Sequence, residues 1–218
     1  MSNVSLNYTI DNNSINILKN ISFEVDYKET ISIVGESGSG KTSLIMLIGG
    51  LEKISAGNIF FKDSEISNMT EDEISEIRRK NIGIVFQSFY LIPNYTALEN
   101  VSLSLEINKL DNATQKAKEI LDRFGLSKRF NNLPSQLSGG EQQRVAIARS
   151  VVMKPELILA DEPTGNLDSE NTENISNLLF NYIKDENASL IMVTHDNNLA
   201  NLTKRKITIK DGVISENQ

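Results

Sequence analysis

The sequence predicts an α/β protein built on a mostly parallel sheet. Two observations lead to that fold class: the alternation of apolar runs with helical patterns, and one long helical stretch. Short apolar runs alternate with helical patterns, and this alternation is typical of parallel strands joined by helical crossovers. The runs with the length of buried strands are residues 30–34, 82–86, 157–160 and 189–194. A longer stretch, 98–152, is helical and more polar, so we expect a helical lobe inserted beside the sheet.

The N-terminal part has a different pattern. Three short strand candidates, at residues 4–10, 21–25 and 57–61, indicate an antiparallel β lobe beside the parallel core. Near the other end of the chain, residues 210–213 read Lys-Asp-Gly-Val, which is typical of a hairpin turn.

The clearest helix is expected at residues 169–184. Its apolar residues recur at helical spacing and form one stripe: Ile175, Leu178, Leu179, Tyr182 and Ile183. Because no repeat or low-complexity linker interrupts the chain, we expect one domain over residues 1–218. Its catalytic core and β lobe would take residues 1–88 and 155–218, and the helical lobe residues 89–154.

Composition excludes several classes of site. The chain has 218 residues, 39% of them hydrophobic, which is enough for a substantial core. It has no cysteine and one histidine, so disulfides, thiol catalysis and cysteine-based zinc sites are excluded and a histidine-rich metal site is disfavoured. The formal net charge is −7 without a basic run, which weighs against nucleic acid as the main partner.

The N-terminus lacks the positive charge and apolar run of a secretory signal, and no segment has the roughly 20 apolar residues of a membrane span. We therefore expect a cytoplasmic protein that acts on a membrane, if at all, through a partner.

A phosphate-binding loop is the strongest motif. The strand at 30–34 leads into GESGSGKT and then into a helix-forming run, which is the context that GxxxxGK[ST] requires. Backbone N–H groups of such a loop and the N-terminus of the next helix bind phosphate. Lys41 would reach the β- and γ-phosphates and Thr42 would bind Mg²⁺; the alternative is a glycine-rich turn. The candidate ATP-binding residues are Gly35, Glu36, Ser37, Gly38, Ser39, Gly40, Lys41, Thr42 and Ser43.

Two acids follow the strand at 157–160. Asp161 would order the shell of the Mg²⁺ ion, and Glu162 would face the γ-phosphate and polarise the attacking water. The alternative is that these acids only begin a loop.

Gln87 and His195 each follow a predicted core strand, at the end where ligands of α/β sheets bind. Either side chain could reach the same phosphates, and Gln87 is also a candidate Mg²⁺ ligand. Taken singly, Gln87 could be a surface amide and His195 a structural residue.

A second anion-binding feature occurs in LSGGEQQR, where Ser138, Gly139, Gly140 and Glu141 open a helix. A helix N-terminus of this kind would bind a γ-phosphate. If the helical lobe projects from the core, these residues cannot reach their own Lys41, so we expect a two-fold dimer in which each chain closes over the other's ATP. The alternative is an ordinary capping box between Ser138 and Glu141, and the two are compatible.

Together these motifs resemble the nucleotide-binding subunit of ATP-binding-cassette (ABC) transporters over the whole chain. Their order is GESGSGKT, Gln87, LSGGEQQR, LILADE, the Asn-Leu-Asp turn that ends at Asp168, and His195. The resemblance implies a P-loop NTPase (RecA-like) core and the cofactors ATP and Mg²⁺. It places Ser138 and Gly140 on the opposite γ-phosphate, Asp168 at the dimer seam and His195 as a γ-phosphate sensor.

The resemblance also assigns stacking on adenine to Tyr8, whose alternative is an ordinary strand residue. The phrases GGLEKISAG, IGIVFQSFYLIPNYTALENV and LADEPTGNLDS are similar to the lipoprotein-releasing and macrolide-export group (LolD- and MacB-like). This similarity implies an integral membrane permease as partner, peripheral attachment to the inner face of the membrane, and no direct contact with cargo. Residues 89–95 would lie beside the groove for the permease's coupling helix, or belong to the core of the helical lobe.

Two other functions remain open at this point. An ATPase of the ABC-type cell-division complex has a similar sequence and transports nothing. A soluble, non-transport ABC ATPase, such as the scaffold of iron–sulfur assembly, has a similar size.

Overall fold

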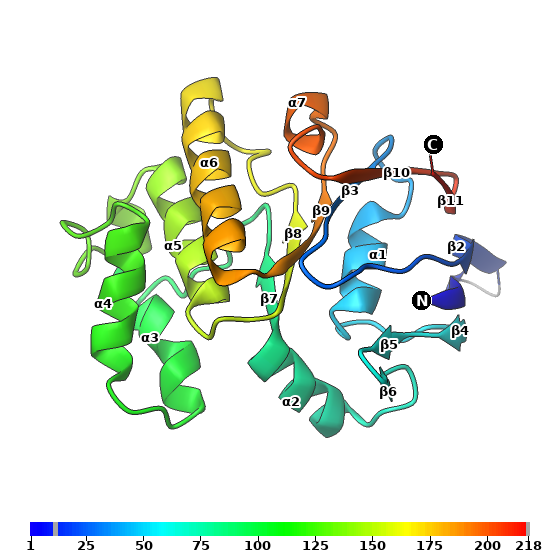
Figure 1. The fold of residues 1–218 in the computed structure, drawn as a ribbon, viewed down its shortest axis with the longest axis horizontal. Coiled ribbons are helices and arrows are strands. Elements are labelled where there is room, and N and C mark those ends of the chain that lie inside the picture. The colour runs from blue at the N-terminus through cyan, green and yellow to red at the C-terminus, as the bar shows by residue number, and fades with distance from the viewer. Residues whose placement is uncertain (11–12, 217–218) are drawn as a thin grey trace.

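A six-stranded sheet forms the centre of the computed structural model, which describes residues 1–10 and 13–216 (Figure 1). Its strand order is β11-β10-β3-β9-β8-β7, and all neighbours are parallel except β10 and β11. The strands are β3 (Thr30–Val34), β7 (Ile82–Val85), β8 (Leu157–Asp161), β9 (Ser189–Val193), β10 (Arg205–Lys210) and β11 (Val213–Glu216). The four predicted core strands are confirmed, with ends that differ by at most one residue.

Continuous apolar runs form these strands because both faces of the sheet are covered. Along β8, Ile158 and Ala160 pack with the helices α3 to α6, whereas Leu157 and Leu159 pack with α1 and the β lobe. Strand β3 lies between β10 and β9, so the loop that follows it begins near the middle of the sheet.

The antiparallel β lobe is present, but its second strand was placed wrongly. The lobe has the order β2-β1-β4, with β1 at Ser2–Ile10, β2 at Asn13–Ile21 and β4 at Ala56–Asn58. The predicted strand at 21–25 shares only Ile21 with β2. The alternation at Ile21 and Phe23 reflects burial of these two side chains. Most residues of β2 itself are exposed in the hairpin, so they form no apolar run that would mark the strand.

The predicted strand at 57–61 is likewise divided. Residues up to Asn58 pair in β4, and Phe60–Phe61 form β5, which pairs with β6 (Ser64–Glu65) in a separate two-stranded sheet. The predicted turn at 210–213 is confirmed, because Lys210 pairs with Val213 across the β10–β11 hairpin.

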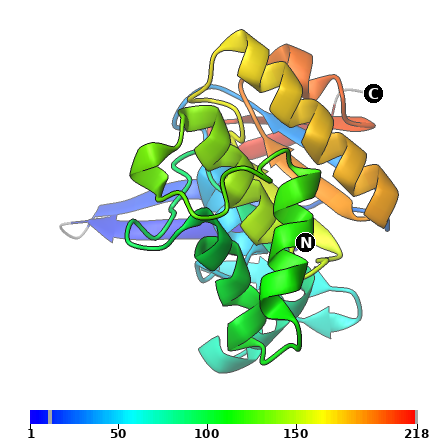
Figure 2. The ribbon, with the colours of Figure 1, turned by 90° about the vertical axis from the view of Figure 1, so that its left-hand side faces the viewer.

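The helices stand on both sides of the sheet. They are α1 (Lys41–Ile48), α2 (Glu71–Asn81), α3 (Ala97–Ile107), α4 (Ala113–Arg123), α5 (Gly139–Val151), α6 (Ser169–Glu186) and α7 (Asn197–Ala200), with a 3-10 turn at Pro134–Gln136. Helices α3 to α5 lie together at one end of the molecule (Figure 1). Seen from that end, strands β1 and β2 extend to one side beyond these helices (Figure 2). The predicted helix at 169–184 is confirmed as α6.

Helix α2 was not predicted. None of its residues is buried, since only Ile74 and Ile77 pack partly against the core. Among the described residues, no helix combines the length and apolar character that crossing a membrane requires.

Candidate functional site

A cleft of about 700 Å³ lies where β3, β7, β8 and β9 end. Four polar residues predicted from strand ends line it together with the glycine-rich loop: Gln87, Asp161, Glu162 and His195. The loop contributes Gly35, Glu36, Ser37, Gly38, Gly40, Lys41, Thr42 and Ser43. The cleft therefore brings together predicted residues that lie up to 160 positions apart in the chain.

The loop wraps around the amine of its own lysine. Gly38 and Gly40 have φ of 79° and 101°, which only glycine adopts readily, and they turn the chain into α1. Lys41 is buried, and its Nζ donates to the carbonyl oxygens of Gly35 (2.9 Å) and Glu36 (2.7 Å). The Oγ of Ser39 is buried without a hydrogen-bond partner. A positive amine and unpaired polar groups in a concave loop suit a polyphosphate.

Asp161 is the residue that fits a divalent cation. It is buried at the end of β8, and its Oδ1 has no hydrogen-bond partner. Burial raises the pKa of Asp161, while a hydrogen bond with the Thr42 side chain opposes that shift. Within the described residues, no three His, Cys, Asp or Glu side chains form a cluster that could hold a metal alone. This donor set suits Mg²⁺, which typically binds one or two protein oxygens together with substrate phosphates and water.

Glu162 has an unusual backbone and a carboxylate held at both oxygens. Its φ is 47°, a conformation that is uncommon for residues other than glycine and often found at functional sites. Its Oε1 lies 2.8 Å from Nδ1 of His195, and its Oε2 accepts a hydrogen bond from Thr194 Oγ1 at 3.3 Å. The Glu162 side chain is only 15% exposed, whereas that of His195 is 69% exposed.

Gln87 is connected to the loop that follows β8. Its Nε2 donates to Asn166 Oδ1 (3.2 Å), and Asn166 Nδ2 donates back to the Gln87 carbonyl (3.0 Å). The two strand ends are therefore linked through a pair of amides.

The residues 138–141 do not line the cleft. Ser138 caps α5, and the predicted capping box is confirmed: the Ser138 hydroxyl accepts from Glu141 N–H (3.2 Å), and Glu141 Oε2 accepts from Ser138 N–H (2.8 Å). Arg129 Nε donates to Glu141 Oε1 at 2.7 Å, and this contact is the main reason why the pKa of Glu141 is lowered. Ser138 and Gly139 are exposed.

Asp168 caps the next long helix. Its Oδ1 accepts from the backbone N–H of Asn171 (2.9 Å) and its Oδ2 from the Asn171 side chain (2.8 Å), which lowers the pKa of Asp168. The carboxylate of Asp168 is exposed.

Tyr8 lies on β1 and does not line the cleft. Its hydroxyl donates to Glu52 Oε2 at 2.9 Å, and this bond raises the pKa of Tyr8. The β lobe contributes Ile17 to the cleft instead, since its backbone oxygen and side chain lie close to Gly40. No sequence signal distinguished Ile17 from the other residues of its strand.

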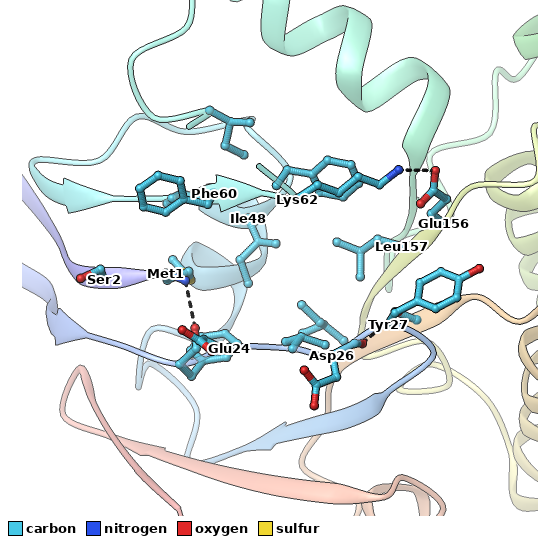
Figure 3. Close-up of a pocket in the computed structure, with 17 residues that line it drawn as sticks. Met1, Ser2, Glu24, Asp26, Tyr27, Ile48, Phe60, Lys62, Glu156 and Leu157 are labelled. Carbon is cyan, nitrogen blue, oxygen red and sulfur yellow. Dashed lines mark hydrogen bonds and ion pairs between the residues drawn. The ribbon is translucent and has the colours of Figure 1, made fainter. Parts of the chain in front are cut away.

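A second large cavity lies at the opposite ends of the strands, near Leu157 and Ser189, where β8 and β9 begin (Figure 3). It measures about 580 Å³, and an ion pair between Lys62 Nζ and Glu156 Oε1 (2.7 Å) lies at its edge. None of the predicted site residues lines this cavity. The predicted phosphate-loop residues other than Ser39, and the four predicted strand-end residues, therefore lie in the cleft beside Lys41 and not in this second cavity.

Comparison with known families agrees with this geometry. A family model described as ABC transporter matches residues 18–165, which include the phosphate loop, residues 138–141 and both acids after β8. The chain belongs to the ABC transporter family. It is therefore an ABC ATPase, with a P-loop NTPase core as the sequence predicts.

Curated relatives refine this assignment. Three are called lipoprotein-releasing system ATP-binding protein LolD: from Cytophaga hutchinsonii (45% identical, covering 92% of this chain and 93% of the relative), Idiomarina loihiensis (42%, 99% and 95%) and Myxococcus xanthus (41%, 98% and 96%). The chain is an ATP-binding subunit of the LolD/MacB type by this homology.

Solved structures agree as well. Two dimeric structures of the cassette MJ0796, one of them a post-hydrolysis state bound to ADP and Pi, match with a TM-score of 0.91 and 40% identity. Each match covers 99% of this chain and 97% of the ABC cassette in the solved structure.

Proposed function

We propose that this ABC ATPase hydrolyses Mg²⁺-bound ATP in a head-to-tail dimer and thereby drives a membrane partner in lipoprotein release or export. The observation that carries the proposal is the single cleft in which Lys41, Thr42, Asp161 and Glu162 meet. The names of the three LolD relatives support lipoprotein release as the process.

Binding of the nucleotide falls to the phosphate loop. Lys41 is already directed toward the carbonyls of Gly35 and Glu36, so its amine would exchange these for the β- and γ-phosphates. Thr42, Asp161 and Gln87 would hold Mg²⁺, which neutralises charge on the phosphates when bound. Tyr8 would stack on the adenine from the β lobe.

Hydrolysis would use Glu162 as the base. A water oxygen bonds to the γ-phosphorus, the bond from that phosphorus to the β–γ bridging oxygen breaks, and ADP leaves with the bridging electrons. The proton of the water passes to the Glu162 carboxylate. His195 lies next to Glu162 and is largely exposed, so its side chain would turn and contact the γ-phosphate when ATP is bound.

The second anion-binding feature supports a dimer. Ser138 and Gly139 are exposed, and residues 138–141 lie outside the cleft of their own chain. We place Ser138, Gly139, Gly140 and Glu141 over the ATP of the partner chain, with Asp168 at the seam between the two copies. The dimeric state of the two solved cassettes supports this arrangement.

The membrane partner would dock on the helical lobe, which we assign to residues 89–154 within the single domain 1–218. Tyr90 and Tyr95 are 65% and 39% exposed there, although Leu91 packs against the core. Exposed aromatic residues are common at interfaces, so we place the permease's coupling helix beside residues 89–95. The subunit would then sit at the inner face of the membrane without touching cargo or nucleic acid.

The experiment uses Glu162→Gln, which should nearly abolish turnover while ATP holds the dimer closed. The tagged variant is expressed in its native cell, membranes are solubilised gently with ATP, and co-purifying proteins are identified by mass. We expect a permease with few spans and a large outer domain. Recovery with soluble partners alone would contradict the transport function, and recovery with a permease linked to wall hydrolases would favour the cell-division alternative. Robust hydrolysis by Glu162→Gln would remove Glu162 from its role.

A further inference from the structure

The two oxygens of the Glu162 carboxylate are held by neighbouring residues of very different solvent exposure. His195 contacts Oε1 with a side chain that is 69% exposed. Thr194 donates to Oε2 and is only 1% exposed. The contact with His195 can therefore be exchanged for another partner much more easily than the contact with Thr194.

Thr194 is fixed by the backbone around it. Its N–H donates to the carbonyl of Ile33 in β3 (3.2 Å), and its hydroxyl oxygen accepts from the N–H of Asp196 (3.0 Å). A hydroxyl has one proton to donate. Because Asp196 N–H occupies a lone pair, the geometry directs that proton to Glu162, whose own N–H is bound to Val193 (2.9 Å).

Glu162 stands between two cavities. It lines the nucleotide cleft and also a cavity of about 580 Å³ between α6 and α7, and His195 lines both. Thr194 lines the second cavity and not the nucleotide cleft. The hydrogen bond from Thr194 therefore holds Oε2 on the side of the second cavity. Once His195 turns away, Oε1 is the oxygen that is available on the side of the nucleotide cleft.

We propose that Thr194 is a positioning residue for ATP hydrolysis, which holds Oε2 of Glu162 so that Oε1 accepts the proton of the attacking water. The inference rests on the proposed role of Glu162 as base. Thr194 itself touches neither nucleotide nor water; it acts by limiting the rotation of the Glu162 side chain. A base that is free to turn between two cavities would be correctly placed for only part of the time.

The test compares Thr194→Val, which keeps the shape and removes the hydroxyl, with Thr194→Ser, which keeps the hydroxyl. Steady-state ATP hydrolysis is measured with the full chain and MgATP, at protein concentrations that allow dimerisation. For Thr194→Val we expect kcat to fall about tenfold or more, as for loss of a hydrogen bond to a charged group, with KM for ATP unchanged. Thr194→Ser should recover most of the lost kcat.

Two controls distinguish an effect on the position of Glu162 from a general loss of stability. Ser32→Ala removes another buried hydroxyl, on β3, whose partners are the Ala200 carbonyl and Thr203 and not Glu162. It should lower thermal stability without changing kcat. In a Glu162→Gln background, Thr194→Val should cause no further loss in single-turnover hydrolysis, because the group it positions is gone. If Thr194→Val does not fold, Thr194→Ala is assayed in the same way.

The possible results distinguish a failure of the Thr194 positioning role from a failure of the proposed ATPase function. A wild-type rate with Thr194→Val, an equal loss with Thr194→Ser, or a further loss in the Glu162→Gln background would each overturn the positioning role while leaving ATP hydrolysis intact. Absence of hydrolysis by the wild-type dimer would overturn both the proposed function and this inference.

Discussion

Asn171, in the first turn of α6, packs directly against Gly140, in the first turn of α5. A Cβ atom on Gly140 would lie 2.5 Å from the Asn171 side-chain oxygen, and the nitrogen of the same amide donates to Asp168 at 2.8 Å. One amide therefore connects the helix start proposed for the partner's ATP with the residue proposed for the dimer seam.

This packing predicts different effects for two neighbouring glycines. Gly140→Ala must displace the Asn171 side chain and loosen its hydrogen bond to Asp168. Because the clashing oxygen is the end of a flexible side chain, we expect a loss of about 1 kcal/mol in unfolding free energy. Gly139→Ala meets only Leu167, at an ordinary 3.7 Å, so it should be neutral or stabilise by about 0.5 kcal/mol through reduced entropy of the unfolded chain. Denaturant unfolding of the single chain without nucleotide measures both. Equal stability of the two variants would show that Asn171 does not constrain Gly140.

Ser138→Arg tests whether residues 138–141 serve the other chain. Because Ser138 is exposed and outside its own cleft, nucleotide binding by the single chain should be unchanged. Hydrolysis should fall about a hundredfold or more, since a phosphate-binding N-terminus would be blocked in the dimer. Binding is measured by calorimetry at low protein concentration, and Ser75→Arg on the exposed face of α2 is the matched control. Loss of binding to the single chain would place Ser138 in its own site instead.

Most of the core could be predicted because its strands are buried on both faces. Strands β8 and β9 are buried along their whole length and are apolar except for one polar residue at an end of each, so their positions follow mainly from hydrophobicity. Strand β2 gives no such signal, since its register comes from backbone pairing with β1 in a hairpin with many exposed residues. Helix α2 has no buried residue, so no apolar stripe predicts it. Its capping box between Thr70 and Glu73 is the sequence signal that could have predicted where it begins.

Site residues could be predicted from the sequence where the end of a single core strand determines their position. Asp161 is the last residue of β8, His195 comes two residues after β9, and Lys41 follows β3 across the glycine-rich loop; parallel strands bring these ends together. Contacts between the loops could not be predicted in this way. The Gln87–Asn166 amide pair and the Thr194–Glu162 hydrogen bond depend on side-chain rotamers and on the left-handed backbone of Glu162.

The ion pair of Glu141 predicts a pH dependence of stability. Arg129, and then the Ser138 N–H, lower the pKa of Glu141 in the folded chain below its ordinary 4.5. A carboxylate whose pKa is lower in the folded than in the unfolded chain stabilises the fold at pH values above its unfolded pKa. This stabilisation is lost as the pH falls through the folded pKa.

Glu141→Gln keeps an acceptor for the cap and removes the charge, so it isolates this contribution. We expect the variant to be less stable than wild type by about 0.5–1 kcal/mol at pH 7, a small value because Arg129 is half exposed. The difference should shrink as pH falls below 4.5. Urea unfolding across pH 3 to 7 measures it, with Glu106→Gln, an exposed acid on α3, as control. A difference that stays constant with pH would exclude the ion pair as its cause.

Tyr8 is the proposed ATP contact with the least support from the cleft itself, and its hydrogen bond suggests how to test it. The hydroxyl is bound to Glu52, so the ring and not the hydroxyl is left to contact adenine. Tyr8→Phe should therefore bind ATP as wild type does, whereas Tyr8→Ala should lose about 1–3 kcal/mol, the usual contribution of stacking between a base and an aromatic ring. Ile15→Ala, at the residue paired with Tyr8 on β2, controls for damage to the hairpin. If Tyr8→Ala and Ile15→Ala weaken ATP binding equally, Tyr8 acts as a strand residue, and the base is bound by another part of the β lobe, where Ile17 already lines the cleft.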